Sequence, residues 1–496
     1  MKAAFNATLL AVSVLIIGAA LFFFGGILIE YATPWYALVS VLLAAWGFKW
    51  ALCRHVSWVW SPMHVPVLLF ASYTLVRYFN STIEHDSRLD ALQVGIWTLV
   101  YFAVATNLHQ PRDRYVITGA LILFALAETG YALWQFRTGN DQVLWLNRSY
   151  DYHGRGGGTF YCPNHLAAFL ELALALMLAW LLVDRQPAAT LQTLVLRRLY
   201  EIAAIAFVVL GLFATQSRGG WIATGVAMIF LLIAGELTRT ISSRVAIAGF
   251  VVAVLGIGGA LSVPAVRDRL EQSIRVDAGF RLGESPVEVT GGIAGRVPMW
   301  RGALAVIRDH PVTGTGPGTW QWFELKYRPA NSQVRPKYAH NDLLQLVAEY
   351  GLLGGLLVLA AIACFYWQAF QLARHAETVE QRAFTVGALT AVTAILMHSL
   401  VDFNLHLPAN FLAVAVLFGL VAAQGRNARR SWRSEVRTVP RLILGVVWVV
   451  LALGLTRVSL PLAQAERASQ RAYVALQEYE WDRSEEHTSE LQSPYV

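Results

Sequence analysis

Apolar segments long enough to cross a membrane recur along nearly the whole chain, and they restrict its fold more than any other feature. A spanning helix needs about 20 predominantly apolar residues. This rule predicts about thirteen spans, at 8–29, 34–53, 63–79, 91–107, 115–136, 164–184, 200–214, 219–234, 246–264, 341–368, 382–401, 408–424 and 440–459. Only 14% of the 496 residues are charged, against about 25% in soluble globular chains. The sequence therefore excludes a soluble enzyme and predicts an all-α polytopic membrane protein with about 12–13 transmembrane helices.

The distribution of Lys and Arg predicts the orientation of these spans. With a cytoplasmic N-terminus, the short inside connections carry about 18 Lys and Arg and the short outside connections about five, as the positive-inside rule requires. The basic segment 424–441 then anchors the topology at the membrane lipids and does not indicate a nucleic-acid partner. Cys53, Cys162 and Cys364 lack metal-site spacing and predict neither a disulfide framework nor a zinc site.

One outer connection, residues 265–340, is far longer than the others and carries eleven Lys and Arg. Within it, 295–311 has helical spacing, with Pro298 expected at the first helical position and Pro311 at the end. We divide the chain into N-terminal spans (1–150), central spans (151–264), the outer loop (265–340), C-terminal spans (341–462) and the start of a truncated outer helical region (463–482). Arg483–Ser493 resembles a translated sequencing adapter, so 483–496 is interpreted as a non-native tail.

Four polar clusters fall at the outer ends of spans, where charged groups indicate function. The first is TQSRGGW (215–221), in which Arg218 sits beside a helix N-terminus, a good receptor for phosphate oxygens. Gly219 and Gly220 are expected to let the backbone turn. In the second, Arg296 lies one helical turn before Trp300 and supplies another guanidinium. The alternatives are a snorkelling Arg218 and a solvated Arg296.

The third cluster is KYAHNDLLQLVAEYGLLG (337–354). His340 precedes a helix that Asn341 or Asp342 can cap, and the positive end of that helix favours a neutral imidazole that can accept a proton. Glu349 lies on about the same face as Asp342 and is expected to pair with an arginine or guide a hydroxyl. The alternative for His340 is an ordinary interfacial histidine.

The fourth cluster is MHSLVDFNLHLPAN (397–410), where His398 and Asp402 are four residues apart and are expected to hydrogen-bond on one helical face. We favour a polar clamp over a metal site, and predict no metal and no cofactor. The segment YHGRGGGTFYCPNHLAAF (152–169) is interpreted as a plain loop or a flexible lid, with Asn164 as a helix cap.

Taken together, SRGGW, R-x3-W with HPVTGTGPGTW, AHNDLLQLVAEYGLLG and HSLVDFNLHLPAN resemble, in content and order, the O-antigen ligase and polymerase superfamily over roughly residues 150–425. The resemblance implies a GT-C-like membrane glycosyltransferase with its active site at the periplasmic face of the bacterial inner membrane, formed at one large periplasmic loop. It implies an undecaprenyl-diphosphate-linked glycan as donor and lipid A–core, another glycan or a protein hydroxyl as acceptor.

Carried over by motif, the resemblance implies that Arg218 and Arg296 hold the diphosphate and that His340 is the catalytic base, with Tyr338 as a weaker candidate. Asp342, Glu349, His398 and Asp402 are expected to support them. Within the family we favour an O-antigen ligase, and the alternatives are an O-antigen polymerase and a protein O-oligosaccharyltransferase. The alternative from another class is a membrane transporter, which polar groups near the midplane would favour.

Overall fold

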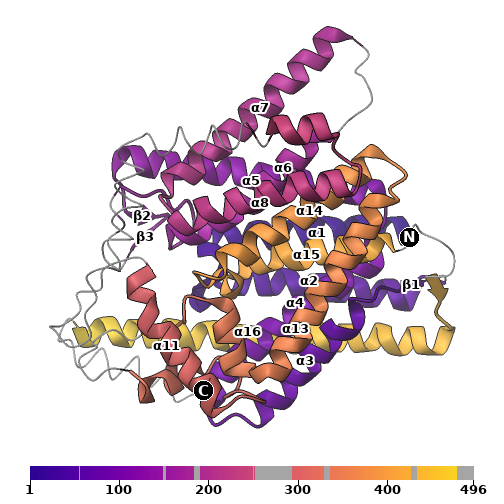
Figure 1. The fold of residues 1–496 in the computed structure, drawn as a ribbon. Helices are drawn as coiled ribbons and strands as arrows, with labels where there is room; N and C mark the ends of the chain where they lie inside the picture. The colour runs from indigo at the N-terminus through magenta and orange to yellow at the C-terminus, as the bar shows by residue number, and fades with distance from the viewer. Residues whose placement is uncertain are drawn as a thin grey trace.

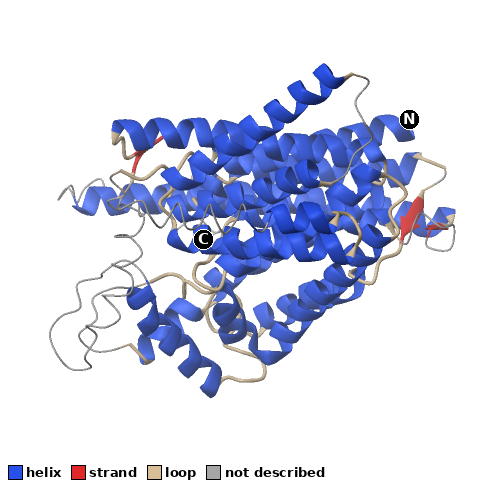
Figure 2. Cartoon of the chain, turned by 45° about the horizontal axis from the view of Figure 1, so that its top comes forward, coloured by secondary structure: helices blue, strands red, loops and turns tan. Residues whose placement is uncertain are grey.

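The computed structural model describes residues 1–54, 56–148, 152, 154–183, 190–249, 251, 293–328, 336–425 and 433–477. Within these ranges the chain is almost entirely helical, with short strands only at the ends of the bundle (Figure 2). Most of the long helices lie side by side, and α7 projects away from the others (Figure 1).

The long helices are α1 (Lys2–Phe22), α2 (Thr33–Leu52), α3 (His64–Phe79), α4 (Glu84–Asn107), α5 (Pro111–Thr138), α6 (Pro163–Leu182), α7 (Leu191–Ala214), α8 (Arg218–Leu237), α13 (Asp342–Arg374), α14 (Val379–His398), α15 (Pro408–Gln424) and α16 (Thr438–Gln477). The shorter elements are α11 (Ile293–Asp309), α12 (Trp320–Phe323), η1 (Phe24–Gly26), η2 (Ile29–Tyr31), η3 (Glu324–Lys326), η4 (Asn404–His406) and the strands β1 (Ser57–Val59), β2 (Gln142–Val143), β3 (Leu146–Asn147) and β4 (Arg433–Glu435).

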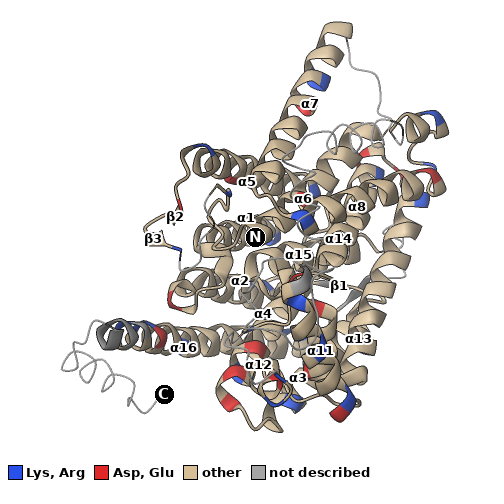
Figure 3. Cartoon of the chain, turned by 60° about the vertical axis from the view of Figure 1, so that its left-hand side comes forward, with Lys and Arg blue, Asp and Glu red and all other residues tan. Residues whose placement is uncertain are grey.

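These helices confirm the prediction of an all-α polytopic membrane protein. Each predicted span coincides with one of them except 246–264, most of which lies outside the described residues. Among the described helices, eight are long and apolar enough to cross a membrane. Figure 3 shows charged residues on α11 and beside α12, which itself carries none, whereas the long helices are mostly uncharged along their length.

Small residues let the helices approach closely, which is how packing compensates for the weak hydrophobic drive between helices in lipid. Helix α2 packs along α16, where a Cβ added at Gly47 would lie 2.7 Å from the Gly445 carbonyl oxygen. Trp46 and Trp448 stack beside this crossing, with ring centroids 4.0 Å apart. Helix α4 similarly packs on α15 against Gly419.

The two ends of the bundle are distinct. At one end, near the N-terminus, β1 pairs with β4, and the Lys49 ammonium donates hydrogen bonds of 2.5 Å to Asn6 and Asn107. At the other end lie β2, β3 and α11 (Figure 1).

A break in α13 joins this helix to the outer loop. Gly351 has φ +67° and ψ −176°, which is a region open essentially to glycine alone. The break frees backbone groups that the loop then satisfies, because Leu352 N–H donates to the Pro311 carbonyl and Gly316 N–H donates to the Glu349 carbonyl. The glycines of HPVTGTGPGTW and EYGLLG thus belong to one interlocked structure.

Two expectations about helix boundaries are changed by the structure. Helix α11 begins at Ile293, so Pro298 lies inside it and not at its first position, although the helix does end before Pro311. Helix α16 runs without interruption from the last predicted span into 463–477, where a separate outer helical region was expected. The predicted tail, 483–496, and Arg281 of the loop lie outside the described residues.

Candidate active site

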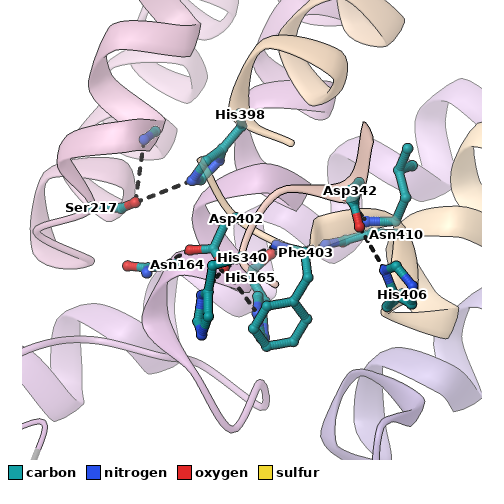
Figure 4. A network of polar contacts seen from close by, with 12 residues as sticks. Asn164, His165, Ser217, His340, Asp342, His398, Asp402, Phe403, His406 and Asn410 are labelled. Carbon is teal, nitrogen blue, oxygen red and sulfur yellow. Dashed lines mark hydrogen bonds and ion pairs between the residues drawn. The ribbon is translucent and has the colours of Figure 1, made fainter. Parts of the chain in front are cut away.

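Asp402 is the centre of a polar network that brings the predicted clusters together (Figure 4). Its carboxylate accepts hydrogen bonds from His340 Nδ1 at 3.0 Å, from Arg296 at 2.9 Å and from the Asn164 amide at 2.8 Å. The Phe403 backbone N–H donates a further bond at 3.0 Å. The residue is 1% exposed, so these donors replace the water that a buried carboxylate loses.

The position of Asp402 follows from the end of α14. That helix ends at His398, and the chain then turns through 399–407 before α15 begins. The expected His398–Asp402 pair on one helical face is therefore wrong, because no helix continues between them. Burial raises the pKa of Asp402, but the Arg296 guanidinium and the His340 hydrogen bond outweigh it and hold that pKa well below its usual range.

His340 is held from several sides while part of its ring stays accessible. Its backbone has φ +49°, a strained conformation for a residue other than glycine, of the kind found at functional sites. The Trp300 indole donates to the His340 carbonyl at 3.2 Å, and Phe403 contacts the ring edge-on. The side chain is 30% exposed. Since a carboxylate only accepts, Nδ1 carries the proton towards Asp402, which leaves Nε2 as the proton acceptor.

The SRGGW segment lies next to this network, at the start of α8. Ser217 caps the helix by accepting the Gly220 N–H, and the half-buried Arg218 occupies the first helical position. Gly219 and Gly220 do not make the expected turn, since both lie inside α8. Instead they permit close packing: a Cβ at Gly219 would lie 3.1 Å from the His398 ring.

His398 pairs with a carboxylate that the sequence analysis missed. Its Nδ1 lies 2.9 Å from Glu171 Oε1 of α6, and both side chains are buried. The Ser217 hydroxyl lies 3.5 Å from His398 Nε2. A Cβ at Gly220 would lie 2.8 Å from Glu171. His398 and Glu171 therefore support the start of α8 beneath Arg218. An acid in the middle of the apolar span 164–184 was the available signal for Glu171.

Residues 152–169, interpreted as a plain loop or lid, are part of the site. Arg155 donates to the Thr215 carbonyl at 2.9 Å and to Asn164 at 2.6 Å, which ties the SRGGW turn to the start of α6. Asn164 does not cap α6, because its side chain bonds Arg155 and Asp402. His165 lies 3.9 Å from Asp402 and packs edge-on against Phe403.

Among the arginines of α11, Arg296 reaches the network. Its side chain is 17% exposed and lies against Asp402. Arg301 is exposed, and Arg308 is 89% exposed and lies near Asp309.

Asp342 and Tyr338 position the segment around His340. Asn341, and not Asp342, caps α13 by accepting the Leu344 N–H at 2.9 Å. Asp342 instead accepts bonds from His406 at 2.6 Å and from the Leu405 N–H at 2.9 Å. Burial lowers the pKa of His406, but the Asp342 carboxylate outweighs it and raises that pKa to about 9.

Tyr338 stacks on Phe403 with ring centroids 4.3 Å apart, and so buttresses the aromatic ring that touches His340. Burial raises the pKa of the Tyr338 hydroxyl, which opposes its ionisation as a base. These contacts assign Tyr338 to packing around the histidine.

Glu349 is a structural anchor, contrary to the expectation that it pairs with an arginine or guides a hydroxyl. It accepts the backbone N–H groups of Gly318 and Trp320 and the Gln345 amide, each at 3.1 Å. It therefore holds the glycine-rich part of the outer loop on α13. Within the described ranges, the His, Cys, Asp and Glu side chains form no group of three or more able to hold a metal ion.

Fold and site together define a polytopic helical membrane protein whose polar, arginine-bearing site lies at the end of the bundle opposite the N-terminus. A family model for O-antigen ligases matches residues 203–359, which include Arg218, Arg296 and His340. The chain is also 24% identical, over 439 residues, to a general O-oligosaccharyltransferase of Acinetobacter baylyi, and the match covers 85% of this chain and 71% of that protein. Both comparisons support a place for this chain in the O-antigen ligase superfamily and a glycan-transferring membrane enzyme.

Proposed function

We propose that this enzyme transfers a glycan from an undecaprenyl-diphosphate donor to an acceptor hydroxyl at the periplasmic face of the inner membrane. The observation that carries the proposal is the contact of one buried carboxylate, Asp402, with both His340 and Arg296. This contact puts a proton acceptor and a phosphate-binding cation side by side, as transfer from a lipid diphosphate requires.

His340 acts as the general base. Asp402 fixes the tautomer with the proton on Nδ1, and Nε2 takes the proton of the acceptor hydroxyl as its oxygen attacks the anomeric carbon. The new bond joins that oxygen to the anomeric carbon, while the bond from the anomeric carbon to the diphosphate oxygen breaks. A single displacement of this kind inverts the anomeric configuration, and a product with retained configuration would contradict it.

Arg218 and Arg296 hold the diphosphate. Negative charge grows on the leaving diphosphate in the transition state, and fixed guanidinium groups stabilise that charge without reorganising. The N-terminus of α8 beside Arg218 adds its partial positive charge. Asp402 holds the Arg296 guanidinium in place at this site, and Arg218 with the start of α8 adds positive charge towards the donor.

The sidedness follows from charge and connectivity. The short connections near the N-terminus carry the larger share of Lys and Arg, which predicts that this end is cytoplasmic. The site lies at the opposite end (Figure 1), which supports a periplasmic active site.

Two kinds of enzyme fit this proposal. The first is an O-antigen ligase, whose acceptor is lipid A–core. The second is a protein O-oligosaccharyltransferase, because the similar Acinetobacter baylyi protein bears that description. The two candidates share donor chemistry and catalytic groups and differ in the acceptor, so the acceptor decides between them.

Purified enzyme in liposomes, supplied with an undecaprenyl-diphosphate glycan and separately with lipid A–core, a free glycan or a serine-containing protein, tests the proposal. We expect product with one acceptor class, and loss of transfer in His340→Ala and Arg218→Ala. His375→Ala and Arg308→Ala, at exposed positions away from the network, are matched controls and should transfer normally. Full activity of either site variant, or transport of the glycan without transfer, would contradict the assignment.

A further inference from the structure

A small polar pocket lies beyond His340, between α4, α12 and the residues that precede α13. Its volume is about 50 Å³, and its polar lining includes Asp86, Asp90, Gln93, Gln321, Lys337 and Gln345. The α4 members are four and three residues apart and so share one helical face. Since a water needs about 10–15 Å³, the pocket has room for a few hydroxyl-sized groups at the edge of a larger ligand.

The walls of this pocket are fixed before any ligand arrives. Gly318, with φ +65°, brings the outer loop so close to α4 that an added Cβ would lie 2.8 Å from the Asp86 carbonyl oxygen. The Trp322 indole donates to the Asp86 carboxylate at 2.6 Å and so ties α12 to α4. A preformed pocket binds without the cost of ordering its walls.

Two amide side chains in the pocket are available to a ligand. The Gln345 amide is engaged, since it accepts the Ala339 N–H and donates to Glu349. In contrast, the half-buried Gln93 and Gln321 make no side-chain hydrogen bond among the described residues. An amide donates and accepts, as does a sugar hydroxyl. The acidic side chains of Asp86 and Asp90 are offset by the basic side chains of Lys337 and His406 in the same lining, so the pocket suits a neutral polyhydroxyl group.

The pocket is linked to the reacting centre on the side away from Ser217 and the start of α8 (Figure 4). Tyr338 and His406 line it, and Tyr338 stacks on Phe403, whose ring touches His340. In Figure 4, Ser217, which precedes Arg218, lies on one side of His340, and His406 lies on the other.

We propose that this pocket binds the hydroxyl groups of a sugar that flanks the bond being made, with Gln93 and Gln321 as the recognising side chains. The proposal rests on the proposed function, because it assumes glycosyl transfer at His340. The sugar belongs either to the acceptor or to the donor glycan, and the shared chemistry is a neutral sugar edge.

Steady-state transfer by the full chain in liposomes tests this site. The concentrations of undecaprenyl-diphosphate-linked disaccharide and of lipid A–core are varied in turn. Each series is measured for the wild type, for Gln93→Met, for Gln321→Met and for the double variant. Losing one hydrogen bond should raise the relevant KM about threefold to tenfold, with a larger rise in the double variant and little change in kcat. Gln371→Met, a half-buried amide near the far end of α13, is the matched control and should leave both KM values unchanged.

A higher KM for lipid A–core alone assigns the pocket to the acceptor, and a higher KM for the disaccharide donor alone assigns it to the donor glycan. Unchanged KM values for both substrates overturn the proposal. If the wild-type enzyme makes no product with lipid A–core, with a free glycan or with a serine-containing protein, the proposed function fails by itself. Calorimetric titration with the released disaccharide and the lipid-free core oligosaccharide then decides the pocket: weaker binding by the double variant supports it, and equal binding overturns it.

Discussion

Replacing Asp402 by Asn removes one negative charge at the point where the site converges. The carboxylate holds two charge-assisted hydrogen bonds in one arrangement, from Arg296 at 2.9 Å and from His340 at 3.0 Å. Hydrogen bonds to charged groups contribute about 1.5–3 kcal/mol each, so their joint loss is worth about 3–6 kcal/mol. If that loss falls on the transition state, the transfer rate decreases by about 10²–10⁴-fold.

The rate loss has two physical origins. An Asn side chain can present its NH₂ to His340 Nδ1, which would shift the ring proton to Nε2 and abolish the base. Arg296 would also lose its counter-charge in a buried setting, which is costly.

Single-turnover transfer in liposomes, with saturating donor, measures this effect directly. Asp309→Asn is the matched control, because Asp309 lies at the end of α11 and bonds Lys326 outside the network. Its rate should equal that of the wild type. Thermal unfolding in detergent separates a rate effect from loss of the fold. A correctly folded Asp402→Asn enzyme that transfers within about threefold of the wild type would refute the role given to Asp402.

The remaining predictions concern His406, Gly351 and Arg296. The pKa of His406 is raised from 6.5 to about 9, so its pairing with Asp342 stabilises the fold fully below about pH 6.5 and is lost as pH rises through about 9. The melting temperature should fall over this interval in the wild type and fall less in His406→Gln; equal slopes would contradict the pairing. Gly351→Ala should unfold the outer loop or lower the melting temperature strongly, since its Cβ would lie 2.2 Å from the Val312 carbonyl oxygen. Gly119→Ala is the matched control and should keep the wild-type melting temperature, because a Cβ added there has no heavy atom within 4 Å. Arg296→Lys should retain binding of the diphosphate donor but lose at least about tenfold in transfer rate. The reason is that Lys keeps the positive charge but lacks the planar guanidinium that binds two oxygens at once. The KM for the donor and kcat, measured separately, check this prediction.

The sequence determined the class of fold, because a spanning helix is a local property of about 20 consecutive residues. Hydropathy therefore located the spans, and the order of the motifs indicated the family. Sequence position also pointed to His340, Arg218 and Arg296, since charged groups at span ends are costly and rarely accidental. The boundaries that failed, such as the start of α11 before Pro298, depend on packing and not on hydropathy.

Only the tertiary structure decided which residues touch. Sequence spacing paired His398 with Asp402, but the helix ends at His398. His398 instead contacts Glu171, and Asp402 contacts His340. The same holds for Gly351, whose conformation is set by a loop about forty residues away in the chain. Buried polar groups must find partners in space, and folding can bring those partners from anywhere in the sequence, so their pairing could not be read from local pattern.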